Sequence, residues 1–567
     1  MSDTENPNEV RGGTLIADRI VALGVDTVFA LSGAAHAPLL MALEDRGVTI
    51  VSTRHESGTV AAADGYARVT GKLGIALIIA EQGIPNAMGA IRTAHDFGSP
   101  VLVLTTRYPD RWIEPDIEVA VDLHEITSST TKWRRTVTAV ERVGEYFDSA
   151  CKAALEGRPG VSVLIMPSNF MATETPVTPP PARPAIRKPA PVAEAIEDAA
   201  ALLATAERPM LVIDSPAAFS GAGEGLRRLA NECNIPALGM GLGRGLVPEV
   251  APLGYPWPFG QRAAPQADVV VVVGATLDMR FGYGIAPRFG ENTRFIHLSE
   301  VAEAIGRNKP VDVPVLGDMA AGTILLADAM AARGYKAAPW IADALKERED
   351  RVQETLDALG DSPIHQIEIG TAIEATFPKE KIVVGDGADV LNFLYARVRM
   401  LQGQSYSDHN PLGSMGIGFP IAIGMAAGER ELAGDKARPT VLVSGDGSIG
   451  FYLAELDSAR RAGLKLIVVV SNDGIWGPEY HGQKIVYGRD VNTVIDHCDY
   501  ATVAKGLGVR SESVADRAEL VPAFERALAH DGPSLIDVRV GLAGGHQRKT
   551  DKLMAMVIFD DVARKNH

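Results

Sequence analysis

The sequence predicts an α/β protein with three doubly wound domains, each built on a parallel sheet. Short apolar runs alternate along the chain with helix-length amphipathic segments, which is the pattern of βαβ units. A length of 567 residues exceeds what a single core accommodates and indicates about three domains. A proline-rich stretch at 176–192 and a charged helical stretch at 342–359 separate three such alternating regions.

The overall composition is that of a globular protein, with 46% apolar and 22% charged residues. A net charge of −16, spread along the chain, argues against nucleic-acid binding as the main role. The cysteines have no CxxC spacing, so neither a disulfide framework nor a zinc site is indicated. The first residues lack the features of a signal peptide, and no apolar run reaches about 18 residues. We therefore expect a cytoplasmic protein without a membrane partner.

The first domain is expected over residues 1–175, with apolar strands at 27–31, 74–80, 101–105 and 161–166. A further apolar run at 47–52 precedes Glu56, which opens an alanine-rich helix. On pattern alone, a carboxylate at this place is most simply a charge at a helix N-terminus.

The other two domains follow the proline-rich linker at 176–192. A central domain is expected at 193–335, with strands at 209–213 and 268–273, and a linker helix at 336–363. The glycine-rich stretch at 239–246 lacks the strand–GxGxxG–helix context and is a weak dinucleotide fingerprint. The third domain is expected at 364–540, with its first strand at 381–385. A tail at 541–567 begins basic, turns apolar and is a candidate active-site lid.

The stretch VLVSGDGSIGFYLAELDSARRAGLKLIVVVSNDGIWG, residues 441–477, carries the most information. Its apolar runs at 441–444 and 466–470 predict two buried strands joined by a Gly-Asp-Gly turn and an amphipathic helix. That helix has Leu453, Leu456 and Ala459 on its apolar face, with Ser458 and Arg461 opposite. Both strand ends fall on the same edge of a parallel sheet, where α/β proteins bind ligands.

Asp446 and Asp473 follow these two strand ends, 27 positions apart. Paired carboxylates there suit Mg²⁺, which takes few protein ligands and completes its shell with phosphate and water. Gly447 allows close backbone approach to a diphosphate, and the amide of Ser448 is placed to donate to it. From these residues alone, two ordinary surface turns are the alternative interpretation.

This pattern resembles the cofactor motif of thiamine diphosphate (ThDP)-dependent enzymes, in which GDG is followed, after about a βα length, by Asn-Asn or Asn-Asp. The resemblance implies a Mg²⁺ site made by Asp446, Asp473 and the main-chain carbonyl of Ile475. Many members have Asn where this chain has Asp473. Asn472 is the weaker candidate ligand, should the register differ by one.

In the first domain, His55-Glu56 followed by DGYAR at 64–68 resembles the HE…GYAR stretch of the same family. The resemblance implies that Glu56 hydrogen-bonds N1′ of the cofactor's aminopyrimidine ring and thereby activates it. A carboxyl group in an apolar cleft has a raised pKa and can share its proton with that nitrogen. EQGIPNA at 81–87 stands where the family has a GPGxxNA loop, with Glu81 and Gln82 in place of Gly and Pro.

The third domain extends the resemblance, because NPLGSMGIGFPIAIGMAAG at 410–428 is similar to the family's GSMG-FG-PAAIG segment. There the Gly413 carbonyl would accept from the 4′-amino group, and Met415 would wedge between the two cofactor rings. A helix beginning near Pro478 would cover the reacting carbon, with Glu479 as a catalytic proton carrier or, alternatively, a surface charge. The remaining cofactor candidates are Ala388, Asp389, Gly447, Ser448, Ile475, Trp476 and Gly477.

The substrate candidates are less specific, and for each the alternative is a packed or solvated residue. They are Ser32, His36, Gln82, Leu123, His124, Tyr480, His481 and His546. Leu123 falls where many members carry Gln, and an apolar residue there would wall a pocket for a small apolar substituent. The stretch at 274–289 resembles GARLNW…FG…PR of 2-hydroxyacyl-CoA lyases and oxalyl-CoA decarboxylases. It makes the central domain a candidate site for an ADP or CoA nucleotide, with Arg280 and Arg288 either on phosphate or in salt bridges.

The resemblance covers nearly the whole chain. It implies pyrimidine-binding, Rossmann-like central and diphosphate-binding domains, in a homodimer or homotetramer with active sites between subunits. We expect a ThDP- and Mg²⁺-dependent carbon–carbon lyase or carboligase that cleaves a short 2-hydroxyacyl-CoA to a carbonyl compound and formyl-CoA, reversibly. The alternatives are benzaldehyde-lyase-type acyloin chemistry, 2-oxo-acid decarboxylation or acetolactate synthesis, and, furthest, a catalytically inactive ThDP-binding regulatory subunit.

Overall fold

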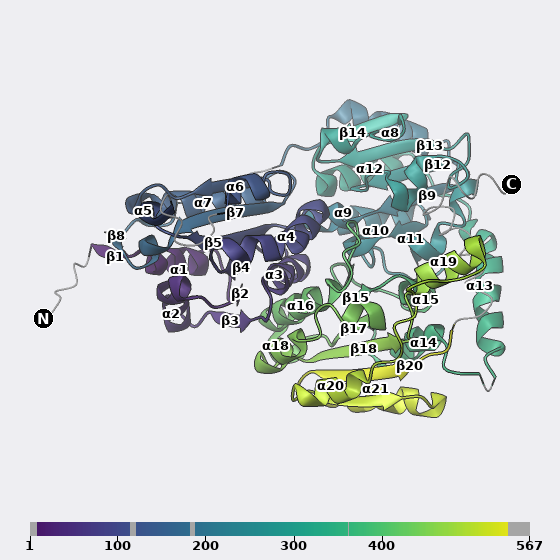
Figure 1. Cartoon of the computed structure of the whole chain (residues 1–567). Coiled ribbons are helices and arrows are strands. Elements are labelled where there is room, and N and C mark those ends of the chain that lie inside the picture. The colour runs from purple at the N-terminus through teal and green to yellow at the C-terminus, as the bar shows by residue number, and fades with distance from the viewer. Residues whose placement is uncertain (1–7, 114–120, 182–187, 361, 543–567) are drawn as a thin grey trace, which may run out of the picture. The chain divides into compact units, whose positions relative to one another are not determined.

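A computed structural model describes residues 8–113, 121–181, 188–360 and 362–542 (Figure 1). It contains three six-stranded parallel sheets and a small antiparallel pair, β1 (Glu9–Arg11) with β8 (Glu174–Pro176). The predicted α/β fold with three parallel sheets is therefore confirmed. The described residues divide into two compact units: unit 1 takes 8–113, 121–181, 409–440 and 452–466, and unit 2 takes the others.

The sheet of unit 1 has the strand order β3-β2-β4-β5-β7-β6. In that order the strands span Thr49–Ser52, Thr27–Ala30, Gly74–Ile78, Val101–Arg107, Val161–Pro167 and Trp133–Thr136. Its helices include α1 (Gly12–Ala22), α2 (Ala37–Asp45), α3 (Glu56–Thr70), α4 (Ala80–Phe97), α6 (Leu123–Ile126) and α7 (Val143–Leu155). Every strand expected from an apolar run is present. The edge strand β6, with the polar sequence WRRT, was not expected.

Two helices of unit 1, α3 and α16 (Gly418–Ala433), pack with their backbones in close approach. A Cβ on Gly65 would lie 2.0 Å from the Ile421 carbonyl oxygen, and one on Gly424 would lie 1.8 Å from the Ala62 carbonyl oxygen. Only glycine fits at these two crossing points. The contact fixes α3, which begins at Glu56, against a rigid neighbour.

The central sheet, in unit 2, has the order β11-β10-β9-β12-β13-β14. Its strands span, in that order, Gly254–Pro256, Ala237–Gly239, Pro209–Ile213, Val269–Val273, Arg294–Ser299 and Val313–Leu316. The five valines of β12 are all buried, as expected for a strand covered on both faces. The accompanying helices are α8 (Ala193–Leu203), α9 (Ser215–Phe219), α10 (Gly223–Glu232), α11 (Trp257–Gly260), α12 (Met319–Ala332) and α13 (Ile341–Asp357).

The third sheet, also in unit 2, has the order β16-β15-β17-β18-β20-β19. The strands span Tyr406–Asp408, Ile382–Asp386, Thr440–Gly445, Leu466–Asn472, Ser534–Arg539 and Arg510–Val514. Its helices include α14 (Gln366–Thr376), α15 (Asp389–Arg397), α19 (Gly477–Tyr487), α20 (Tyr500–Gly506) and α21 (Leu520–Leu528). One apolar cluster joins the two sheets of unit 2, because Leu345 of α13 packs in the same core as Ile367 of α14 and Phe393 of α15.

Three local expectations were wrong. EQGIPNA at 81–87 lies inside α4 and not in a loop, with Pro85 within the helix. The Gly-Asp-Gly turn is the start of a short helix, α17 (Asp446–Ile449), and the amphipathic segment forms a separate helix, α18 (Glu455–Arg461). Ser458, expected on the polar face, is buried, and its hydroxyl donates to Glu455, which offsets the cost of burying it.

Across the described residues, no helix is both long and apolar enough to cross a membrane.

Candidate active site

Two carboxylates stand where neighbouring strands of the third sheet end. Asp446 follows β17 and is buried, and Asp473 follows β18 and is half-buried. One Asp446 oxygen accepts from the Gly447 amide at 2.8 Å, and the other accepts from the Gly474 amide at 2.6 Å. The second bond ties the loop after β18 to the carboxylate after β17. The two loops are therefore locked together at one edge of the sheet.

No side-chain cation of the described residues pairs with these two carboxylates. Burial and the neighbouring Asp446 raise the pKa of Asp473 to about 7, and burial raises the pKa of Asp446. In the described ranges neither carboxylate forms an ion pair, and no three His, Cys, Asp or Glu side chains gather as a metal cluster. Two carboxylates plus the main-chain carbonyl of Ile475 are a donor set that fits Mg²⁺, which keeps several of its waters.

Asn472, the other candidate for this position, is engaged elsewhere. Its amide donates to Asp537 at 2.8 Å and to the Cys498 carbonyl at 2.9 Å, and its oxygen lies 2.9 Å from a ring nitrogen of His497. The Asn472 side chain is completely buried. Of the two neighbours, Asp473 is thus the better candidate to meet a cation, since its carboxylate oxygens keep further lone pairs.

The candidate residues for a diphosphate come together at the same edge. Gly387, after β15, has φ +93°, and a Cβ there would lie 3.2 Å from the Ser448 hydroxyl and 3.3 Å from the Gly445 nitrogen. A Cβ on Gly477 would lie 2.0 Å from a carboxylate oxygen of Asp389, the first residue of α15. Glycines at 387 and 477 thus let the loops after β15, β17 and β18 touch. This places Ala388, Asp389, Gly447, Ser448 and Gly477 around one small area.

Trp476 closes one side of this area. A Cβ on Gly447 would lie 2.5 Å from the Trp476 ring, so the ring rests on the glycine. The Trp476 amide donates to the Thr493 carbonyl at 2.8 Å, and the ring meets Phe451 edge-on with centroids 6.5 Å apart. Ile475, just before it, is buried.

Helix α19 follows directly and begins near Pro478, as expected. Glu479, the predicted proton carrier, is exposed, whereas Tyr480 and His481 are half-buried. Lys484 bonds the Tyr480 hydroxyl, and burial followed by Lys484 lowers the pKa of His481. The structure therefore places all three candidates on the helix that leaves the carboxylate edge.

In unit 1, Glu56 is the first residue of α3 and is 6% exposed, so it is a buried acid and not a solvated helix charge. The ring of His55 caps the helix by accepting from the Ser57 amide at 3.1 Å. The amide of Asn86, on α4, donates to a Glu56 oxygen at 3.1 Å. Asn86, from the segment expected as a loop, therefore orients the predicted catalytic acid.

Glu455 supports Glu56 and was missed by the sequence analysis. Its carboxylate accepts from the amides of Arg54 at 3.0 Å and His55 at 3.2 Å, which are the two residues that lead into α3. Burial raises the pKa of Glu455, and the hydrogen bond from Ser458 opposes that rise. The available sequence signal was an acidic residue beside Leu456 on the buried face of α18.

The loop before α16, also in unit 1, carries Gly413 and Met415. Gly413 has φ +81°, a left-handed conformation that favours glycine, and its amide donates to the His409 carbonyl at 3.0 Å. Gly413 is exposed and Met415 is half-buried. The Gly413 backbone is therefore accessible.

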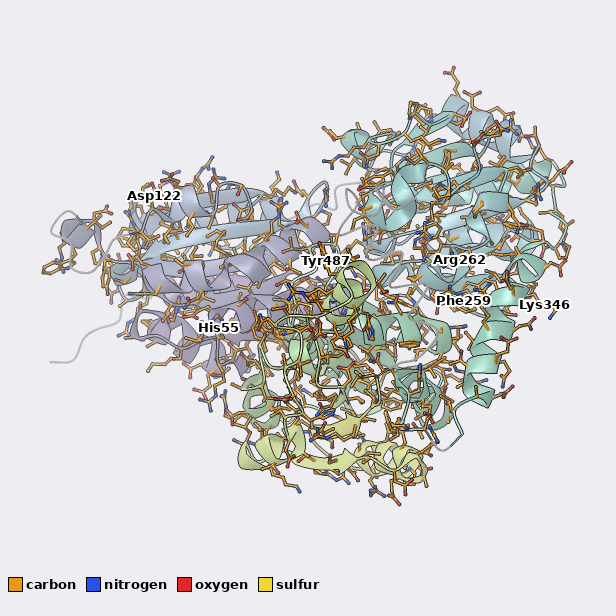
Figure 2. The ribbon with its side chains drawn as sticks, turned by 45° about the vertical axis from the view of Figure 1, so that its right-hand side comes forward. His55, Asp122, Phe259, Arg262, Lys346 and Tyr487 are labelled. Carbon is orange, nitrogen blue, oxygen red and sulfur yellow. The ribbon has the colours of Figure 1, made fainter. Side chains whose placement is uncertain are left out.

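The substrate candidates of unit 1 are spread over its surface and core. Ser32 and Gln82 are exposed, whereas His36 is fully buried and burial lowers its pKa to about 4. Leu123 is buried at the start of α6, which Asp122 caps (Figure 2). A ring nitrogen of the exposed His124 lies 2.9 Å from the Thr136 hydroxyl. His546 lies outside the described residues.

In the central domain the two arginine candidates differ. The guanidinium of Arg280 lies 2.8 Å from Asp278 and 3.1 Å from Asp214, so it already forms ion pairs with two carboxylates. Arg288 has no ion pair within the described part of the chain, and its buried Nε has no hydrogen-bond partner there. Burial and nearby Arg262 lower the pKa of Arg288.

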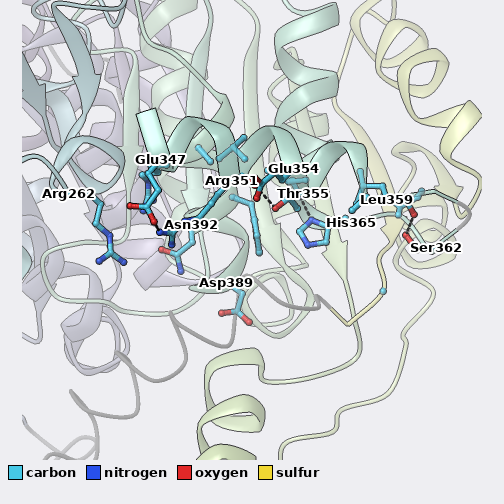
Figure 3. A pocket seen from close by; sticks show the side chains of 18 of the residues that line it. Arg262, Glu347, Arg351, Glu354, Thr355, Leu359, Ser362, His365, Asp389 and Asn392 are labelled. Carbon is cyan, nitrogen blue, oxygen red and sulfur yellow. Dashed lines mark hydrogen bonds and ion pairs between the residues drawn. The ribbon is translucent and has the colours of Figure 1, made fainter. Parts of the chain in front are cut away.

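A pocket of about 1180 Å³ opens in unit 2 among α13, α14 and α15. Arg262, after α11, lies at one end, and Ser362 lies at the other (Figure 3). Asp389 of the carboxylate edge forms part of its wall, as do Gly541 and Leu542 at the start of the tail. The pocket thus extends from the candidate diphosphate area toward the central domain.

Arginines that form no ion pair with any carboxylate of the described residues gather at the Arg262 end. Arg348 stacks over Phe259 at 4.8 Å, with Arg399 at 5.2 Å from the same ring (Figure 2 labels Phe259 and Arg262). Burial together with Arg262, Arg399 and Arg288 lowers the pKa of Arg348 to about 10. In contrast, Arg351 on the same helix is paired with Glu347 (Figure 3). The excess positive charge at Arg262, Arg288 and Arg348 suits an anionic ligand.

Comparison with known proteins gives matches along most of the chain. Three family descriptions match: "Thiamine pyrophosphate enzyme, N-terminal TPP binding domain" at residues 10–128, the central domain at 196–326, and the C-terminal TPP binding domain at 391–538. An acetolactate synthase large subunit of Mycobacterium tuberculosis is 30% identical over 558 residues, covering 97% of this chain and 99% of that protein. Mouse 2-hydroxyacyl-CoA lyase 1 is 24% identical over 562 residues, covering 94% of each chain.

A solved structure supports the fold. The X-ray structure of a candidate thiamin diphosphate-dependent enzyme isolated from Mycobacterium smegmatis superposes with a TM-score of 0.80 at 22% identity. The match covers 94% of this chain and 100% of the other.

Proposed function

Since this chain belongs to the family of thiamine diphosphate-dependent enzymes, we propose that it is a Mg²⁺-dependent carbon–carbon lyase or carboligase acting on a short 2-hydroxyacyl-CoA. Cleavage gives a carbonyl compound and formyl-CoA, and the reverse reaction is an acyloin-type condensation. The assembly is a cytoplasmic homodimer or homotetramer with active sites between subunits. The proposed domains are the pyrimidine-binding domain at 1–175, the central domain at 193–335 and the diphosphate-binding domain at 364–540.

The positions of the chain's own residues support the following proposed roles. Asp446, Asp473 and the Ile475 carbonyl hold Mg²⁺, and the glycine-lined loops around Ser448 hold the diphosphate. Bound ThDP supplies a nucleophilic carbon that takes up the electron pair of the broken bond. Glu56, buried and oriented by Asn86, holds a proton at N1′ of the pyrimidine.

Further roles are proposed on the same basis. The Gly413 carbonyl would accept a hydrogen bond from the 4′-amino group of the cofactor, and Met415 would lie between its two rings. Glu479 exchanges the proton of the substrate hydroxyl, with Tyr480 and His481 as pocket walls.

The observation that carries the acyl-CoA assignment is the cluster of arginines at one end of the pocket. Arg262 and Arg348 face the pocket, Arg288 adds its charge nearby, and no described carboxylate pairs with any of the three. The phosphates of CoA would supply the missing negative charge. Asp389 lines the same pocket and borders the diphosphate area, so an acyl chain extending from CoA would reach the cofactor.

The test is cleavage of a 2-hydroxyacyl-CoA with detection of formyl-CoA. Arg348→Met should raise KM for the CoA ester about tenfold or more, because a charge-assisted phosphate contact is lost. Lys346→Met is the matched control, since Lys346 lies on the same helix, is 70% exposed and pairs with Asp350 (Figure 2). An enzyme that binds ThDP yet neither cleaves nor binds CoA esters would contradict the proposal.

A second candidate function is 2-oxo-acid chemistry, favoured by the 30% identity with an acetolactate synthase large subunit. Pyruvate is the diagnostic substrate. Release of CO₂ with formation of acetolactate, and no turnover of CoA esters, would establish this alternative. Turnover of a simple acyloin without CoA would instead establish benzaldehyde-lyase-type chemistry.

A further inference from the structure

We propose that Gln366 is a positioning residue for the metal ligand Asp473, an inference that rests on the metal site of the proposed function. Gln366 is the first residue of α14 and is 3% exposed. Its Nε2 donates to one carboxylate oxygen of Asp473 at 3.0 Å. The two residues are 107 positions apart in the sequence.

The hydrogen bond fixes the rotation of the Asp473 carboxylate. The other Asp473 oxygen accepts from the Ile475 amide at 3.2 Å, so each oxygen has one donor. A carboxylate held at both oxygens presents its remaining lone pairs in a set direction. Groups that hold a metal ligand in this way are worth a large part of the affinity of the site.

Helix α14 is itself held firmly at this end. The ring of His365 accepts from the Ile367 amide at 3.1 Å, while Glu368 accepts from the His365 amide at 2.8 Å, which completes a capping box. Arg517 pairs with Glu368 from outside the helix. The amide of Gln366 is therefore delivered from a rigid element and not from a loop.

The pairing is compatible with an aspartate at position 473. Many members of the family have asparagine there, which offers a single oxygen and must place its NH₂ against an acceptor. Aspartate instead offers a second oxygen, which needs a donor, and Gln366 provides one. The Gln366 Oε1 is buried and has no hydrogen-bond partner among the described residues. A water from the hydration shell of Mg²⁺ would satisfy it.

The test measures Mg²⁺ affinity by calorimetry on the full chain with saturating ThDP, together with thermal unfolding of the cofactor-free protein. Gln366→Leu should weaken Mg²⁺ binding about 10- to 100-fold, the usual cost of losing a group that orients a metal ligand. Gln366→Glu should weaken it as well, because two carboxylates would then face each other and turn Asp473 aside.

The decisive variant exchanges the two groups. In the double variant Gln366→Glu/Asp473→Asn, the glutamate accepts from the asparagine amide, and the total charge of the pair is unchanged. Mg²⁺ affinity should return to within about threefold of Asp473→Asn alone, which a double-mutant cycle quantifies. Gln353→Glu is the matched control, since Gln353 also donates to an aspartate, Asp357, at 2.8 Å, but on the exposed face of α13.

The outcomes separate this inference from the proposal it rests on. Loss of affinity in Gln366→Leu and Gln366→Glu, with recovery in the double variant, supports it. Unchanged affinity in Gln366→Leu overturns it, as does a parallel loss of stability and affinity that the double variant fails to restore. If Asp473→Ala leaves Mg²⁺ binding intact, the metal site of the proposed function is itself wrong.

Discussion

Unit 2 contains two six-stranded parallel sheets, and both carry carboxylates near the ends of their strands. The two edges differ in the groups that contact these carboxylates. At the central sheet, Asp214 follows β9, and Arg280 pairs with it at 3.1 Å and with Asp278 at 2.8 Å. At the third sheet, the hydrogen bonds that Asp446 and Asp473 receive from described residues all come from neutral amides.

Both sheets have an edge at which α/β proteins can bind ligands. We infer that an edge is available to a cation only where its carboxylates are not already paired with a side chain of the protein. At the central edge, Arg280 already pairs with both carboxylates, so a phosphate placed there would meet two carboxylates around one arginine. The third edge holds two carboxylates together against their repulsion and therefore favours an external divalent cation. The two edges should accordingly respond differently to substitution.

The largest effect is expected from Arg280→Met at the central edge. Removing the guanidinium leaves Asp214 buried and unpaired, and breaking a buried pair in this way costs about 3–5 kcal/mol. Thermal unfolding should show a clearly lower midpoint, while Mg²⁺ and ThDP affinity in the folded fraction stay within about twofold. Arg228→Met is the control, because its partners Glu232 and Asp328 are exposed and such pairs contribute at most about 1 kcal/mol. Equal losses of stability in the two variants would contradict the interpretation that Arg280 neutralises buried charge at the central edge.

The next effect is expected at the third edge, from Asp446→Ala. If Asp446 is the proposed Mg²⁺ ligand, its loss should weaken Mg²⁺-dependent ThDP binding at least about 100-fold, or about 2.7 kcal/mol. Calorimetry with ThDP in the presence and absence of Mg²⁺ measures this. Asp278→Ala, which removes a carboxylate from the loop after β12 of the central sheet, should leave the affinity within about twofold. A comparable loss in both would mean that the two edges are not functionally distinct.

The sequence predicted the third edge well because its information is local. Apolar runs fix β17 and β18, a parallel sheet brings their ends together, and Asp446 and Asp473 follow those ends directly. The same reasoning found α3 with Glu56 at its start. It failed for β6, whose WRRT sequence has no apolar run, because a strand at a sheet edge needs less burial.

The supporting residues were missed because their contacts are not local. Gln366 meets Asp473 across 107 positions, and Glu455 meets the amide of Arg54 across 401. Nothing in the neighbouring residues marks either side chain as a partner of a site. For Arg280 the pattern allowed a phosphate contact or a salt bridge, and only the fold decides that Asp214 lies within reach.

A smaller, pH-dependent effect is expected from His297 on β13 of the central sheet. Burial lowers the pKa of His297 to about 4 from its ordinary 6.5, and the side chain is fully buried. Between these two pKa values the unfolded chain binds a proton that the folded chain excludes. The contribution to stability is therefore full above pH 6.5 and falls as the pH drops toward 4, by about 2 kcal/mol at pH 5.

Thermal unfolding at pH 7.5 and pH 5 tests the His297 contribution. His297→Gln should show a smaller acid-induced drop in midpoint than the parent protein. If His297→Gln retains the full drop, the acid sensitivity arises elsewhere. The loss of stability in acid would then not distinguish the central sheet from the third sheet.

The smallest effect is expected from Gly447→Ala, compared with Gly445→Ala in the same Gly-Asp-Gly segment. A Cβ at position 447 would lie 2.5 Å from the Trp476 ring, whereas a Cβ at 445 meets nothing within 4 Å. Gly445 also has φ −69°, which alanine adopts without strain. The Trp476 ring can shift, so Gly447→Ala should cost about 1 kcal/mol in the cofactor-free protein and change the tryptophan emission. Gly445→Ala should stay within about 0.5 kcal/mol with unchanged emission. Identical unfolding midpoints and spectra for the two variants would show that Trp476 does not rest on Gly447, and that the third edge is more open than its contacts indicate.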